Sequence, residues 1–227
     1  MFEILKNPVR DYSCLRIHNL NSDEFRHLWL LVYWPVFGIL FRLAELVIPL
    51  EACHEVYCSL DDYIPFVEYF VIPYVFWYFY LIGIHIYTLL YDMDAFRRLM
   101  KFIMITYTAA LAVYLLWPNC QMLRPETFER DNLFTRFMAD FYQFDTNTNV
   151  CPSLHVVGSL AVCFTSWHSR GLNDRSGLSG KIIHQCFNIS AILISISTVF
   201  LKQHSVIDIM AALTLCIPAY WYCFRRK

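Results

Sequence analysis

The chain has 227 residues, of which 58% are hydrophobic and only 16% are charged. Soluble domains are about 45–50% apolar and about 25% charged, so this composition indicates a membrane protein rather than a soluble one. The net charge of −1 argues against nucleic acid as a partner, because no excess of basic residues is left to neutralise phosphates.

Six apolar segments are long enough to cross a bilayer, which takes roughly 20 residues in a helix. Backbone groups cannot stay unpaired in lipid, so each segment is expected to be helical. We therefore predict an all-α integral membrane protein, a six-transmembrane-helix bundle in which residues 1–227 form a single membrane domain. The predicted spans are 28–49, 63–90, 100–118, 151–167, 182–201 and 206–224.

The distribution of basic residues predicts the orientation of these spans. If the N-terminal segment 1–27 is cytosolic, the cytosolic side carries thirteen lysines and arginines, and the opposite side carries four. Cytosolic loops are enriched in basic residues, so both termini are expected in the cytosol. The loop after the first span falls on the other side, and it is acidic: it holds Glu51, Glu55, Asp61 and Asp62, with no lysine or arginine.

Two features of the first span and its flanking loop carry expectations of their own. Arg42 and Glu45 lie three apart at membrane depth, where charges are costly, so we expect a structural ion pair. Cysteines cluster in the non-cytosolic loops. In an oxidising compartment either Cys53–Cys58 or Cys120–Cys151 could form a disulfide, although no spacing rule requires one. No CxxC spacing occurs, so no metal site is expected.

The loop 119–150 is the longest segment between spans and is predicted to be non-cytosolic. It mixes charged residues with aromatic ones, as an amphipathic helix lying in the membrane interface does. Such a helix could flank an entry path for lipids. The alternative is a surface helix that caps the bundle. The aromatic residues are Phe128, Phe134, Phe137, Phe141 and Tyr142.

The start of the fourth span carries a candidate anion site. Pro152 is well placed to begin a helix, and the N–H groups of a first helical turn are unpaired and can receive an anion. Ser153 and Leu154 would supply those donors, and His155 would face the same space as a proton donor. The alternative is that Ser153 is an ordinary helix cap and His155 a polar residue at the interface.

His204 and Asp208 are four residues apart, which places them on one face of a helix within hydrogen-bonding reach. A carboxylate on one ring nitrogen fixes the tautomer and makes the other nitrogen a better nucleophile. The alternative is a polar pair that caps the sixth helix. Arg124 and Lys202 fall on the same side of the predicted membrane, where arginine and lysine could bind phosphate oxygens.

Together these residues resemble the type 2 phosphatidic acid phosphatase superfamily, which also contains lipid head-group phosphotransferases. The family has a Lys-x6-Arg-Pro segment, a Pro-Ser-Gly-His segment and a Ser-Arg-x5-His-x3-Asp segment. The resemblance covers roughly residues 117–212. In chain order, the matching residues are Leu123-Arg124-Pro125, Pro152-Ser153-Leu154-His155, and Ser197-Thr198 followed by His204 and Asp208.

The resemblance implies a role for each matched residue. His204 would be the nucleophile that forms a phosphohistidine, Asp208 its orienting partner, His155 the acid for the leaving group and Arg124 a phosphate ligand. The family uses no metal for this step.

Two basic residues of the family pattern are replaced, by Trp117 and Thr198, and Lys202 could restore one charge. Loss of cations should weaken binding of a phosphomonoester more than binding of a less charged diester.

The sequence therefore predicts a multi-pass membrane enzyme that transfers phosphoryl groups from a membrane lipid phosphate through a phosphohistidine. It would be of the lipid phosphate phosphatase type, without a cofactor, and its active site would lie on the non-cytosolic face within the helices of residues 151–224. One alternative is a head-group phosphotransferase of the inositol phosphorylceramide and sphingomyelin synthase type. Another is a non-catalytic transporter or scaffold with degenerate motifs.

Overall fold

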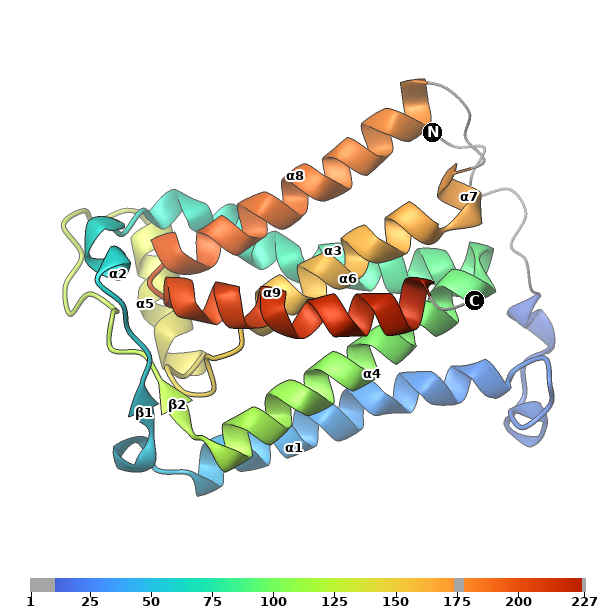
Figure 1. Cartoon of the computed structure of the whole chain (residues 1–227), viewed down its shortest axis with the longest axis horizontal. Helices are drawn as coiled ribbons and strands as arrows, with labels where there is room; N and C mark the ends of the chain where they lie inside the picture. Colours follow the sequence, from blue (N-terminus) through green and yellow to red (C-terminus); the bar gives the residue numbers. More distant parts are fainter. Residues whose placement is uncertain (1–10, 174–177, 226–227) are drawn as a thin grey trace.

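A computed structural model describes residues 11–173 and 178–225, and these residues form a bundle of long helices with a short strand pair at one end (Figure 1). The helices are α1 (Tyr33–Val47), α2 (Leu60–Tyr63), α3 (Val71–Tyr91), α4 (Met93–Leu116), α5 (Leu133–Phe144), α6 (Leu154–His168), α7 (Arg170–Asn173), α8 (Leu178–Phe200) and α9 (Val206–Tyr220), and the strands are β1 (His54–Glu55) and β2 (Asn119–Cys120). Short 3-10 helices precede α1 (Arg26–Val32) and α3 (Glu68–Phe70), and a π-helix (Trp221–Arg225) follows α9.

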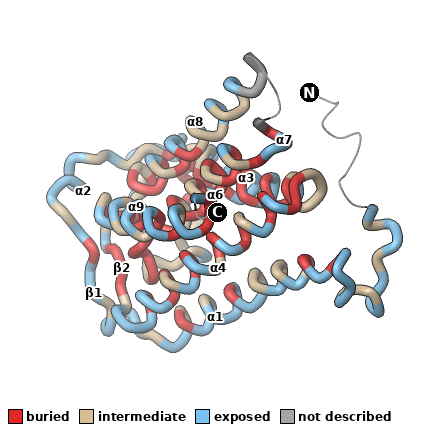
Figure 2. Tube along the Cα trace, turned by 45° about the vertical axis from the view of Figure 1, so that its right-hand side comes forward, coloured by how far each residue is buried: buried red, intermediate tan, exposed pale blue. Residues whose placement is uncertain are grey.

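The expectation of an all-α membrane protein is confirmed at the level of architecture. Within the described residues, five helical segments are long and apolar enough to cross a membrane. Their apolar side chains face outward to a large extent, as on the edge helix α1, where much of the tube is exposed (Figure 2). Lipid tails would cover such a surface. The five segments are Arg26–Val47, Glu68–Tyr91, Met93–Leu116, Lys181–Phe200 and Val206–Arg225.

The predicted fourth span, 151–167, is not among these five. Its helix α6 has 15 residues, which corresponds to about 22 Å, whereas a hydrocarbon core is about 30 Å thick. Helix α6 packs against α3, α4, α8 and α9, so protein rather than lipid surrounds it. A helix in this central position does not need the length of a lipid-exposed span.

The end of the bundle that carries β1, β2, α2 and α5 lies opposite the end where α7 and the C-terminal end of α9 are found (Figure 1). Strands β1 and β2 are parallel, with His54 opposite Asn119 and Glu55 opposite Cys120. Helix α2 is joined to the start of α9 by Asp61, a buried residue whose carboxylate accepts hydrogen bonds from the backbone N–H of Val206 (2.9 Å) and from Ser205 Oγ (2.6 Å).

The predicted amphipathic helix in loop 119–150 is α5. Asn132 caps it, Met138 is fully buried, and Leu133 and Phe144 are exposed. Its inner face packs with Val71 of α3 among other apolar residues. The helix therefore covers the end of the bundle and also presents apolar side chains outward, so neither alternative for this loop excludes the other.

The ion pair expected in the first span is confirmed, with Arg42 Nη1 and Glu45 Oε2 3.1 Å apart. Glu45 also accepts a hydrogen bond from Thr146 Oγ1, a contact between α1 and the loop that precedes α6. Part of the predicted cytosolic surface, residues 1–10 together with Arg175, Arg226 and Lys227, lies outside the described residues.

Candidate active site

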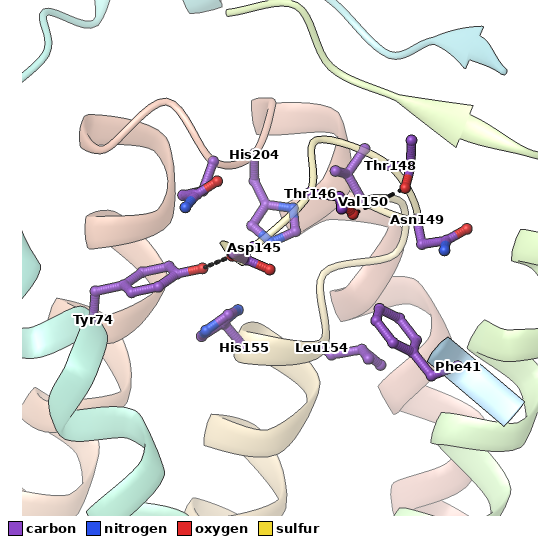
Figure 3. A pocket seen from close by; sticks show the side chains of 11 residues that line it. Phe41, Tyr74, Asp145, Thr146, Thr148, Asn149, Val150, Leu154, His155 and His204 are labelled. Carbon is purple, nitrogen blue, oxygen red and sulfur yellow. Dashed lines mark hydrogen bonds between the residues drawn. The ribbon is translucent and has the colours of Figure 1, made fainter. Parts of the chain in front are cut away.

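A small cavity of about 70 Å³ opens at the end of the bundle that carries α5 and the strand pair, and both histidines of the sequence prediction line it (Figure 3). The walls come from α1, α3, the loop between α5 and α6, the start of α6 and the turn before α9. The lining residues are Phe41, Tyr74, Asp145, Thr146, Thr148, Asn149, Val150, Leu154, His155, Gln203 and His204.

His204 is held by the helix that follows it. Its Nδ1 lies 3.0 Å from Oδ2 of Asp208, which is fully buried. The same carboxylate oxygen accepts the backbone N–H of Ser205 at 3.0 Å and closes a capping box at the start of α9. The capping pair expected as the alternative is therefore present, and the same carboxylate also lies against Nδ1 of His204.

His155 approaches His204 from the first turn of α6. The centroids of the two rings are 5.9 Å apart, although the residues are 49 positions apart in the chain. Tyr74 stacks on His155 at 4.2 Å and Trp77 lies tilted against it at 4.4 Å, so aromatic rings of α3 fix the imidazole. Its Nε2 is buried without a hydrogen-bond partner among the described residues, which leaves this nitrogen available to a ligand.

The first turn of α6 is only partly available to an anion. The backbone N–H of Ser153 donates to the carbonyl of Asp208 at 3.2 Å, so the prediction that it would bind phosphate is wrong in this structure. The hydroxyl of Ser153 is buried and has no partner within the described chain. The side chain of Leu154 lines the cavity. The backbone N–H of Ser153, which the sequence assigns to a ligand, therefore binds a carbonyl of the neighbouring helix α9.

Arg124 lies beside the cavity and not in its wall. Its guanidinium donates to the carbonyl oxygens of Tyr142 (3.0 Å) and Thr146 (2.9 Å) and to Oε1 of Gln203. Burial lowers its pKa, and the nearby Asp145 carboxylate opposes that shift. Arg124 thus fastens the loop and the turn that build the cavity, and it contributes positive charge from behind Gln203.

Lys202 is not brought to the cavity. Its backbone adopts a left-handed conformation with φ of 53°, and its Nζ donates to the carbonyl of Asp61 at 2.7 Å. Burial lowers the pKa of Lys202, while Asp61 and Asp62 raise it. The prediction that Lys202 replaces a lost phosphate ligand does not agree with this position, because the side chain is directed to the acidic loop around α2.

Trp117 and Thr198, which stand where the family pattern has basic residues, do not line the cavity either. Trp117 stacks on His54 of β1, with centroids 5.7 Å apart. Thr198 is buried, and its carbonyl accepts the backbone N–H groups of Gln203 and His204 at 2.9 and 3.1 Å. Thr198 therefore shapes the turn that presents His204, which is a structural role.

Tyr74 and Asp145 are among the polar residues of the cavity that sequence reasoning missed. The hydroxyl of Tyr74 donates to Asp145 Oδ2 at 3.1 Å, and in the close-up this carboxyl lies between the two imidazoles (Figure 3). Burial raises the pKa of Asp145, with Arg124 and His204 acting in the opposite direction. No motif signals either residue, because Tyr74 lies in an apolar run and Asp145 in an irregular loop.

The walls of the cavity therefore carry few charged side chains. Neither lysine nor arginine is among its described lining residues, and the carboxyl of Asp145 is the one acidic group among them. Any positive charge must come from His155 and His204 and, from behind, from Arg124. A doubly charged anion would find less compensation here than a singly charged one.

No protein-family model, no curated protein and no solved structure matches the chain. The resemblance to lipid phosphatases thus depends on the three short motifs and on the geometry of the residues that they contain. Across residues 11–173 and 178–225, no group of three or more His, Cys, Asp or Glu side chains is arranged to hold a metal ion.

Proposed function

We propose that the protein is a multi-pass membrane enzyme that transfers a phosphoryl group from a lipid phosphate ester through a phosphohistidine at His204. The observation that supports this most directly is the convergence of His155 and His204 on one cavity, with ring centroids 5.9 Å apart. Asp208 provides the third group, because it holds Nδ1 of His204 and leaves Nε2 to react.

The reaction has two steps. Nε2 of His204 attacks phosphorus while His155 protonates the departing alkoxide of the lipid, so a P–N bond forms as the P–O bond breaks. A water molecule or a lipid hydroxyl, deprotonated by His155, then attacks the phosphohistidine and releases His204. Since the two rings share one cavity, each can reach the same phosphoryl group.

A second candidate, head-group transfer from a phosphodiester, is favoured by the charge of the cavity. The guanidinium of Arg124 already donates to Tyr142, Thr146 and Gln203. Asp145 adds a carboxyl to the cavity in which a phosphate would lie. A phosphodiester carries one negative charge and tolerates this environment better than a phosphomonoester with two. The second acceptor would then be a lipid hydroxyl in place of water.

The membrane arrangement follows the basic residues. Helices α1, α3, α4, α6, α8 and α9 run between the same two ends of the bundle (Figure 1), which supports six crossings in which α6 is the short central one. The turn between α3 and α4 would be cytosolic together with α7, both termini and the basic residues Arg97, Arg98 and Lys101. The cavity then opens on the non-cytosolic face.

The test is an assay of the purified protein on a panel of lipid phosphomonoesters and phosphodiesters, with a chelator present. His204→Ala should abolish turnover, whereas His184→Ala, a histidine of α8 outside the cavity, should retain it. Release of inorganic phosphate identifies the phosphatase, and label found only in a new lipid identifies the transferase. Full turnover by His204→Ala would refute a phosphohistidine at His204, and no turnover by wild type on any lipid of the panel would favour the non-catalytic transporter or scaffold.

A further inference from the structure

The parallel pair of strands brings together two cysteines that are far apart in the sequence. Glu55 of β1 is opposite Cys120 of β2. Side chains along a strand alternate between its two sides, so Cys53, two residues before Glu55, projects on the same side as Cys120. The two backbones are hydrogen-bonded on either side of Glu55. His54 N–H donates to the carbonyl of Pro118 (2.8 Å), and Val56 N–H donates to the carbonyl of Cys120 (2.7 Å).

The side chains of these two residues also lie close together. Both cysteines are free, and each thiol shifts the pKa of the other, while Cys53 Sγ donates to the carbonyl of Pro49 at 3.6 Å. Of the partners that lie nearer in the sequence, Cys151 has its thiol on another group, and the backbone of Cys58 is fixed by a separate hydrogen bond. Cys151 is buried with its thiol against Asp208, and the loop of Cys58 is held by the bond from its N–H to Asp61 Oδ2 at 2.9 Å.

We propose that Cys53 and Cys120 form a disulfide, rather than either of the pairs within one loop, and that this bond clasps the loop after α1 to the loop after α4. The proposal depends on the topology under which both loops face a non-cytosolic, oxidising compartment. It does not depend on the chemistry assigned to His204.

The oxidant is a small-molecule disulfide such as glutathione disulfide. The thiolate of Cys53, the more exposed of the two residues, attacks the disulfide and displaces one glutathione thiolate. The thiolate of Cys120 then attacks the Cys53 sulfur of the mixed disulfide and displaces the second glutathione. Two protein thiols lose their protons and two electrons, and one glutathione disulfide becomes two glutathione molecules. Burial raises the pKa of both thiols, so this exchange should be slow at neutral pH.

The bond would act on the wall of the cavity. Cys120 follows Asn119, whose side-chain oxygen accepts the backbone N–H groups of Val150 (2.9 Å) and Cys151 (2.8 Å). Asn119 Nδ2 also donates to the carbonyl of Cys151 at 3.1 Å. A covalent link at Cys120 thus fixes β2 and, through Asn119, the segment that leads into the first turn of α6.

The experiment maps thiols in the full-length protein in membranes. Free thiols are blocked with N-ethylmaleimide before solubilisation, and peptides are analysed without reduction. A second sample is first equilibrated with glutathione disulfide. We expect a linked peptide pair that carries Cys53 and Cys120, converted by reduction into two separate peptides. Cys53→Ser should remove that pair and leave Cys120 free, and the matched control Cys58→Ser should retain it.

Two results would overturn the proposal: maleimide on both Cys53 and Cys120 after equilibration with glutathione disulfide, or a linked pair that joins Cys53 to Cys58 or Cys120 to Cys151. Wild type alone decides these outcomes, so a variant that fails to fold does not blur them. Because the readout is a peptide mass, an inactive protein that carries the bond would refute the proposed activity and leave the disulfide intact.

Discussion

At the scale of single residues, the carboxylate of Asp208 is the most heavily used group of the candidate site. One oxygen accepts both Nδ1 of His204 and the N–H of Ser205, each at 3.0 Å. The helix cap and the orientation of the imidazole therefore depend on the same atom. This sharing makes the two functions separable only by a substitution that keeps an acceptor and removes the charge.

Asp208→Asn is that substitution. An amide oxygen can still accept the N–H of Ser205, but it no longer stabilises the positive charge that develops on His204. We expect kcat to fall by about 10²–10⁴, the range for loss of acid–base assistance, with little change in the thermal midpoint. Asp62→Asn, on the exposed side of α2, is the control. An unchanged kcat in Asp208→Asn would assign Asp208 to helix capping alone.

Asp145 leads to a prediction with a pH dependence. Because burial raises the pKa of this carboxyl, it is neutral at acidic pH and becomes charged only as the pH rises through the raised value. Asp145→Asn keeps the neutral shape at every pH. We expect its KM for a lipid phosphomonoester to be about tenfold lower than that of wild type above the raised pKa, because a repelling charge is gone.

Below the raised pKa of Asp145 the two proteins should have equal KM values, since the wild-type carboxyl is then protonated. The measurement is KM as a function of pH for both proteins. A constant ratio of the two KM values across the pH range would show that the charge of Asp145 does not reach the substrate.

At the scale of elements, close packing of α6 fixes the position of His155. Gly158 lies one turn after His155, and a Cβ at this position would lie 2.8 Å from Tyr107 Oη, 2.9 Å from Trp77 Nε1 and 3.0 Å from Trp77 Cζ2. Trp77 is the residue whose ring lies against His155. Glycine thus lets α6 approach α3 and α4 closely. Trp77, which contacts Gly158, also contacts the imidazole of His155.

Gly158→Ala should therefore destabilise the protein by about 1–3 kcal/mol, the usual cost of overpacking, and should lower kcat by displacing Trp77. The matched control is Gly83→Ala in α3, where nothing lies within 4 Å of the added Cβ. Thermal unfolding in detergent and turnover measure the two effects. Equal midpoints for the two variants would contradict the close approach of α6 to its neighbours.

Asp61 joins α2 to α9 and yields a prediction at the same scale. Its carboxylate accepts from Ser205 Oγ, from the N–H of Val206 and from the N–H of Cys58, and the residue is buried. Asp61→Ala leaves these donors unpaired. We expect the free energy of unfolding to fall by about 2–3 kcal/mol, as for loss of a buried charged acceptor.

The unfolding midpoint of Asp61→Ala is to be compared with that of Asp62→Ala. Asp62 is the neighbouring acidic residue and is exposed, so its loss should change stability little. A midpoint of Asp61→Ala within error of wild type would mean that the acidic loop does not cap α9.

At the scale of the whole molecule, orientation in the membrane is the property most open to a direct test. We expect tags at both termini to be accessible only after permeabilisation of intact cells that express the protein at their surface, and a tag inserted near residue 126, in loop 119–150, to be accessible without it. Antibody binding to intact and permeabilised cells measures this. Access to a terminal tag in intact cells would reverse the topology and place Cys53 and Cys120 in a reducing compartment.

The sequence alone determined that the protein is a helical membrane protein, and it placed His204 and Asp208 within reach of each other. Long apolar segments form helices in lipid, because each backbone group must be hydrogen-bonded within the segment. A separation of four residues places His204 and Asp208 on one helical face whatever the tertiary structure is. These are local properties, governed by hydrophobic length and helical period.

Only the tertiary structure decided what depends on contacts between distant segments. It brought His155 to His204, placed Asp145 beside Tyr74, turned Lys202 toward Asp61, and paired β1 with β2. It also made α6 a short central helix, because protein rather than lipid surrounds it. Side-chain direction at such positions is set by packing between segments far apart in the chain, which no local pattern encodes.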